Sequence, residues 1–181
     1  MPTAGTDPLR KLFTLLDADR DGHLRSADYQ RLVDRILRHY QLDDDDHEAI
    51  LLRAAYARYW RELLGDDVER VNDETFFAAH CLVTPGPVFQ ALNGIVHAVL
   101  TIARTGYENT INKEEFNRLM SVLGVTGPAA AAAFSWLDSD ADGKVGCAEF
   151  IRAAEGYFLA EDHTAPGAVL FGMYDPAPPI S

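Results

Sequence analysis

The chain has 181 residues, 48% of them hydrophobic, which is enough for one globular body or two small lobes and excludes extensive disorder. Its 28 acidic and 16 basic residues leave a formal net charge of −12. Nucleic acids and anionic membrane surfaces are therefore not expected as partners.

Cysteine use and local hydropathy indicate where the chain works. The two cysteines, Cys81 and Cys147, are far apart in sequence, so we expect no disulfide framework and a reducing, cytoplasmic location. Residues 1–13 lack the apolar stretch of a signal peptide. The most apolar run, 88–103, is too short and too polar to span a membrane. The Ala- and Arg-rich composition is typical of a high-GC bacterial source.

The first motif is the segment DADRDGHLRSAD at residues 17–28. It matches the calcium-loop pattern D-x-[DN]-x-[DN]-G-x5-E except at its last residue. Apolar residues recur at helical spacing on both sides, which predicts a helix–loop–helix unit, the EF-hand. The expected oxygen ligands at positions one, three, five, seven and twelve are the side chains of Asp17, Asp19, Asp21 and Asp28 and the carbonyl group of His23.

Two residues predict that this first loop binds calcium less tightly than a standard loop. Asp28 stands at the twelfth position, where glutamate usually binds calcium through both carboxylate oxygens. One methylene fewer favours a single oxygen ligand, which suits six-coordinate magnesium. Arg25 at the ninth position adds a positive charge at the rim. We therefore expect lower calcium affinity here, or mixed Ca²⁺ and Mg²⁺ occupancy.

The two inner units keep the helix–loop–helix pattern but lose most of their ligands. With Val71 at the eighth position, the second loop spans 64–75, has few oxygen ligands and is predicted not to bind. With Ile111 at that position, the third loop spans 104–115 and begins with Arg104 instead of a carboxylate. We expect no ion here, and the guanidinium group is an alternative internal cation that would pair with Glu108 or Glu115.

The fourth loop, DSDADGKVGCAE at residues 138–149, matches the calcium-loop pattern at every specified position. Without a cation, its carboxylates would be crowded and uncompensated, so a metal-free acidic turn is the weaker interpretation. The ligands expected here are the side chains of Asp138, Asp140, Asp142 and Glu149 and the carbonyl group of Lys144. Because the third loop is its predicted pairing partner, calcium should bind the fourth loop as a single independent site.

These units predict an all-α fold in which four EF-hands form two pairs within one compact body, with short β-bridges joining the paired loops. We expect an N-terminal pair over residues 1–84, a C-terminal pair over 85–163 and an extended tail over 164–181. The boundary between the pairs falls at the Thr-Pro-Gly-Pro segment 84–87.

Two competent outer loops, two degenerate inner loops and this chain length resemble the sarcoplasmic calcium-binding protein group, especially its bacterial, calerythrin-like members. The segment APGAVLFG at residues 165–172 is similar to the tail of that group. The resemblance implies two EF-hand pairs around a shared apolar interior, and a calcium buffer or carrier. The third loop departs from the group, because it binds an ion in many relatives.

We therefore expect a monomeric, non-enzymatic calcium buffer with two sites, the first also accepting Mg²⁺. A calcium sensor with a protein target is the alternative, although a sensor groove is typically Met-rich and this chain has 3 methionines. A third interpretation is a ligand-binding or catalytic protein that uses His80, Cys81 or His97 with Tyr56, Tyr59 and Trp60. Histidines on such apolar helices are more typical of a packed core.

Overall fold

The computed structural model describes residues 8–81 and 86–159, which form eight α-helices and four short β-strands. The first half contains α1 (Pro8–Leu16), β1 (His23–Leu24), α2 (Ser26–Tyr40), α3 (His47–Leu64), β2 (Val71–Asn72) and α4 (Asp73–Cys81). The second half contains α5 (Pro87–Ala103), β3 (Thr110–Asn112), α6 (Lys113–Val122), α7 (Gly127–Leu137), β4 (Lys144–Gly146) and α8 (Cys147–Leu159). The tail expected over 164–181 and part of the expected boundary at 84–87 lie outside the described residues.

The loops associate in pairs through the four short strands. β1 and β2 are antiparallel and place Leu24 opposite Val71, while β3 and β4 place Ile111 opposite Val145. These are the apolar eighth-position residues, and all four are buried. The predicted fold of four helix–loop–helix units with short β-bridges is therefore confirmed, and each outer loop is joined to an inner one.

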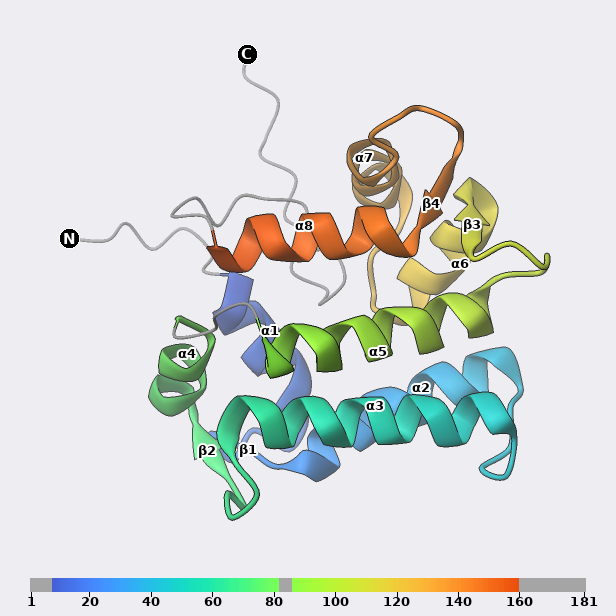
Figure 1. Ribbon diagram of the computed structural model, residues 1–181. Coiled ribbons are helices and arrows are strands. Elements are labelled where there is room, and N and C mark those ends of the chain that lie inside the picture. Colours follow the sequence, from blue (N-terminus) through green and yellow to red (C-terminus); the bar gives the residue numbers. More distant parts are fainter. Residues whose placement is uncertain (1–7, 82–85, 160–181) are drawn as a thin grey trace.

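The two halves share one apolar interior. Figure 1 shows α5 lying between α3 and α8, and both neighbours pack against it. The side of α5 that faces this interior is almost wholly apolar, and its buried residues include Phe89, Leu92, Val96 and Leu100. Aromatic rings bring the units of each half together, as Phe13 meets Phe76 and Phe116 meets Phe150. The helices thus hold the loops on a packed, rigid frame.

The ends of the helices follow local sequence signals. Pro87 begins α5, where its missing N–H is not needed. The Asn112 side chain accepts hydrogen bonds from the first turn of α6, and Glu115 bonds back to the Asn112 N–H. No helix within the described ranges has the length and hydropathy needed to cross a bilayer.

Candidate metal-binding loops

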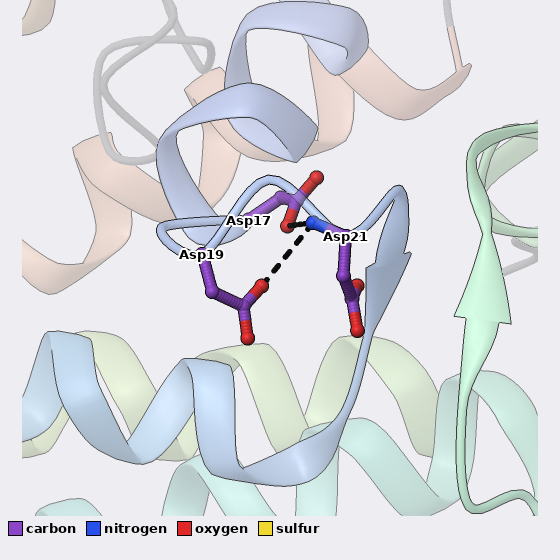
Figure 2. A group of neighbouring side chains, drawn as sticks. All are labelled: Asp17, Asp19 and Asp21. Atoms are coloured by element: carbon purple, nitrogen blue, oxygen red, sulfur yellow. Dashed lines mark hydrogen bonds between the residues drawn. The ribbon is translucent and has the colours of Figure 1, made fainter.

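The loop at residues 17–28 folds its first carboxylates inward through hydrogen bonds to its own backbone. Asp17 accepts from the N–H of Asp21 at 3.1 Å and from that of Gly22 at 3.0 Å. Gly22 has a φ of 76°, a left-handed conformation that glycine adopts without strain, and this turns the chain back. Figure 2 shows Asp17, Asp19 and Asp21 around the turn, and each places one carboxylate oxygen within 4.8 Å of the others.

The loop at residues 138–149 repeats this backbone geometry. Asp138 accepts from the N–H groups of Asp142 and Gly143, both at 3.0 Å. Gly143 has a φ of 81°, which matches Gly22. Oxygens of Asp138, Asp140 and Glu149 lie within 4.8 Å of one another. Such clustered carboxylate oxygens are the ligands that hard divalent cations prefer, so both loops fit a calcium or magnesium ion.

The two loops differ at the twelfth position. In the last loop, one oxygen of Glu149 accepts from the Gly146 N–H at 2.9 Å. The other oxygen crosses the loop to the N–H and hydroxyl of Ser139, at 3.0 and 3.3 Å. Glu149 therefore spans the loop from its ninth to its second position, and its carboxylate joins the cluster that Asp138 and Asp140 form.

Asp28 does not span its loop. One of its oxygens accepts from the Arg25 N–H at 2.5 Å, and the other contacts the guanidinium group of Arg31. Asp28 is absent from the oxygen cluster of the first loop, which consists of Asp17, Asp19 and Asp21. The shorter side chain reaches the ninth position but not across to the second.

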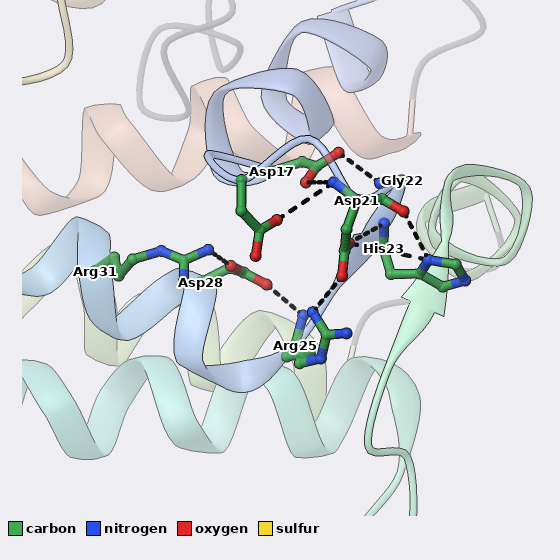
Figure 3. Close-up of polar contacts among 8 residues, drawn as sticks. Asp17, Asp21, Gly22, His23, Arg25, Asp28 and Arg31 are labelled. Atoms are coloured by element: carbon green, nitrogen blue, oxygen red, sulfur yellow. Dashed lines mark hydrogen bonds and ion pairs between the residues drawn. The ribbon is translucent and has the colours of Figure 1, made fainter.

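Positive charge also sits directly on the first loop. The Arg25 side chain, which the sequence placed at the rim, forms an ion pair with Asp21 at 2.8 Å (Figure 3). This hydrogen-bonded guanidinium lowers the pKa of the Asp21 carboxyl group and the carboxylate in turn raises the pKa of Arg25. In the last loop the ninth position is Gly146, which carries no charge.

The remaining expected ligands lie at the edges of these clusters. Asp142 stands outside the three-residue cluster and accepts from the Lys144 N–H at 2.8 Å. His23 and Lys144, whose carbonyl groups are the expected seventh-position ligands, begin β1 and β4. Asp21 lies in the first cluster, whereas Asp142 and Asp28 join neither.

The third loop satisfies its own polar groups. Arg104 donates to the carbonyl oxygens of Tyr107 and Glu108, at 3.3 and 3.2 Å. The alternative that Arg104 pairs with a carboxylate is therefore wrong. Glu115 accepts from Thr105 and Asn112, and Glu108 contacts Lys144 of the last loop. Both carboxylates bond to other donors instead.

The second loop lacks a comparable oxygen cluster among the described residues. The Val68 carbonyl, at the fifth position, accepts from the Trp60 indole N–H at 3.2 Å. Asn72 caps α4 by accepting from the Thr75 N–H at 2.9 Å. This loop thus serves as a packing partner for the first loop.

Sequence reasoning missed Arg31. An arginine stands three residues after the twelfth position in three of the four units, as Arg31, Arg118 and Arg152. This recurrence was visible in the sequence, but the pattern for a calcium loop ends at its twelfth residue. The signal gave no indication that Arg31 would turn back toward the loop while Arg118 stacks on Tyr40.

No protein-family model matches the chain. Among known proteins, calerythrin of Saccharopolyspora erythraea is 25% identical over 171 residues, which cover 87% of this chain and 94% of calerythrin. A Streptomyces coelicolor calcium-binding protein superposes with a TM-score of 0.71 and 25% identity, over 83% of this chain and 95% of that one. Calcium-loaded apo-aequorin from Aequorea victoria shares the fold, with a TM-score of 0.70, 13% identity and coverage of 86% and 90%.

Proposed function

Because the chain is a calerythrin-like EF-hand calcium-binding protein, we propose that it works as an intracellular calcium buffer or carrier with two sites. The observation that carries this proposal is the convergence of Asp138, Asp140 and Glu149, with Glu149 spanning the loop. The proposed ligands of the two sites are Asp17, Asp19, Asp21, His23 and Asp28, and Asp138, Asp140, Asp142, Lys144 and Glu149. The His23 and Lys144 ligands are carbonyl oxygens.

The two proposed sites differ in ion preference. Calcium takes six to eight oxygens and accepts a bidentate carboxylate, whereas magnesium requires six ligands in a smaller shell. Glu149 can supply the bidentate carboxylate that calcium accepts, whereas Asp28 suits the smaller, six-ligand shell of magnesium. We therefore propose calcium at residues 138–149, and calcium or magnesium at residues 17–28.

The apolar surface supports a buffer. A sensor exposes a groove for a partner helix when calcium binds, and such grooves are commonly rich in methionine. The methionine within the described ranges, Met120, is fully buried. Among the described residues, the large exposed apolar side chains lie on three separate segments: Ile50 and Leu51 on α3, Tyr107 in the third loop and Trp136 on α7.

The interior supports a role without catalysis. His80 is buried between the Tyr59 hydroxyl at 3.2 Å and the Phe76 carbonyl at 2.8 Å. A cavity of about 20 Å³ lies between helices α2, α3, α5 and α6, lined by residues such as Ile36, Tyr56 and Val96. This is room for roughly one water molecule, whereas pockets for organic ligands measure roughly 300–1,000 Å³.

A calcium-dependent regulator is the second candidate function. The structure of the similar Streptomyces coelicolor protein gives a structural basis for prokaryotic calcium-mediated regulation by that protein. This likeness is the observation that supports a regulatory role for the present chain.

The experiment combines calorimetry with Ca²⁺ and Mg²⁺, fluorescence of an apolar dye and small-angle scattering. A buffer should take up two cations with little change in dye fluorescence or in radius of gyration. A large calcium-dependent rise in dye fluorescence would favour the regulator. Absence of calcium uptake by residues 138–149 would refute both.

A further inference from the structure

The arginine three residues after the twelfth position makes different contacts in the two outer units. Arg152 donates to the Ser139 hydroxyl at 3.2 Å, and that hydroxyl bonds to Glu149. Arg31 instead contacts the carboxylate of Asp28 directly. The arginine at this position thus contacts a neutral hydroxyl in the last loop and an expected metal ligand in the first.

The cause lies at the second and twelfth positions. Ser139 supplies an N–H and a hydroxyl that occupy the far oxygen of Glu149. The first loop has Ala18 there, which lacks a hydroxyl and donates its N–H to the Leu16 carbonyl at 2.8 Å. Asp28 is also too short to cross the loop, so its second oxygen remains for Arg31.

Burial makes this contact matter in the metal-free protein. The Asp28 side chain is 2% exposed, and that of Arg31 is 47% exposed. A buried carboxylate needs a compensating charge or donors, since burial without them is strongly unfavourable. Arg25 provides a second cation through its ion pair with Asp21. In Figure 3, Arg31 lies to the left of the Asp28 carboxylate and Arg25 to its right.

We propose that Arg25 and Arg31 form an intramolecular cation clamp, which competes with the divalent ion for Asp21 and Asp28. The inference rests on the proposed function, because it assumes that the first loop is a cation site. The clamp stabilises the metal-free loop by neutralising two of its carboxylates. A divalent ion has to compete with both guanidinium groups for these carboxylates, so the clamp lowers the affinity of this loop.

The clamp predicts effects of opposite sign on two measurable quantities. Arg31→Gln leaves Asp28 without its ion pair, so the metal-free protein should unfold at lower temperature. The same change removes the competitor, so the loop should bind calcium about threefold to tenfold more tightly, as for partly exposed charged pairs. A side chain that only supported the fold would lower both quantities together.

The test follows calcium titrations by NMR, with the Gly22 amide reporting the first loop and the Gly143 amide the last. Arg25→Gln should also tighten binding at Gly22. Arg35→Gln, an exposed site one turn further along α2, is the control for charge and should change the Gly22 midpoint by less than about twofold. Arg152→Gln, the positional match of Arg31, should shift the Gly143 midpoint by less than about twofold because its partner is a hydroxyl.

Two results would overturn the clamp: unchanged or weaker binding at Gly22 in both the Arg25 and Arg31 variants, or no calcium response at Gly22 in any of the proteins. The proposed function is judged separately in the same samples by Gly143. If Gly143 responds and Gly22 never does, the clamp fails while the calcium-binding function stands. If Gly143 fails to respond, the proposed function fails, whereas tighter binding at Gly22 would still support the clamp.

Discussion

The loops at residues 17–28 and 138–149 are two versions of one design. Both bond the first carboxylate to the N–H groups at the fifth and sixth positions, and both turn on a glycine with positive φ. They diverge where Ala18 replaces Ser139 and Asp28 replaces Glu149. One hydroxyl and one methylene thus decide whether the twelfth residue spans the loop or is held by an arginine.

The inner loops show what a degenerate unit still contributes. Leu24 and Ile111 each pair with an apolar residue of the neighbouring loop, so both bridges form whether or not both loops have ligands. The second bridge adds the Glu108–Lys144 ion pair between the loops. Pairing therefore depends on buried eighth-position residues, which survive the loss of carboxylates.

Neutralising the twelfth residue should reveal the largest difference in calcium affinity between the two outer loops. Glu149→Gln keeps an oxygen for the Gly146 N–H but removes the charge and the bidentate ligand, so calcium affinity should fall about a hundredfold. Asp28→Asn should weaken the first loop less than about tenfold, because one oxygen is at stake. Calorimetry measures both changes. Equal losses in the two loops would contradict the comparison.

The two halves should also differ in acid sensitivity. Within the described ranges, the buried polar side chains Asp17, Asp28 and His80 all belong to the N-terminal half. Burial lowers the pKa of the His80 imidazole from the ordinary histidine value of 6.5 to about 4. Below pH 6.5, His80 binds a proton in the unfolded chain but stays neutral in the folded protein. The free energy of unfolding therefore falls as the pH drops from 6.5 toward 4.

Urea unfolding of the calcium-free protein tests this difference. Between pH 7 and pH 5, the wild type should lose about 2 kcal/mol more than His80→Gln. His97→Gln, at an exposed position on α5, is the matched control and should follow the wild type. Parallel pH dependence of the wild type and the His80 variant would show that His80 is not the source of the acid sensitivity.

Exchanging the twelfth residues should reduce the difference in calcium affinity between the two outer loops. Asp28→Glu should tighten calcium binding by about tenfold, since glutamate can reach across the loop and offer both oxygens. Glu149→Asp should weaken the last loop by about the same factor. Calorimetry with Ca²⁺ and Mg²⁺ on both variants is the measurement. Unchanged calcium affinity in the Asp28 variant would mean that side-chain length does not limit the first loop.

The ion pair between the inner and outer loops should have the smallest effect. Glu108→Gln removes the partner of Lys144, and both side chains are substantially exposed, at 71% and 45%. Exposed pairs contribute little, so affinity at the last loop should fall by less than about threefold. A larger loss at Gly143 in a calcium titration would show that the third loop controls its neighbour electrostatically.

The fold was predictable from the sequence more fully than the contacts within the site. Glycine turns, apolar eighth positions and helical spacing are local signals, and they placed all four units and both bridges. The reach of Asp28 was also predictable, because side-chain length is a property of the residue. The contact between Arg31 and Asp28 was not predictable, since it depends on a missing hydroxyl at Ala18 and on burial of Asp28. Likewise, nothing in the sequence indicated that Arg104 bonds to carbonyl oxygens.

The central claim, that the chain holds two working loops of unequal strength, is tested most directly by one NMR titration of the wild-type protein with calcium. The Gly22 and Gly143 amides both bond to the first carboxylate of their loops, so each reports its own site. We predict that the Gly143 signal changes first and is complete before that of Gly22 reaches its midpoint. Coincident midpoints, or an earlier change at Gly22, would contradict this account.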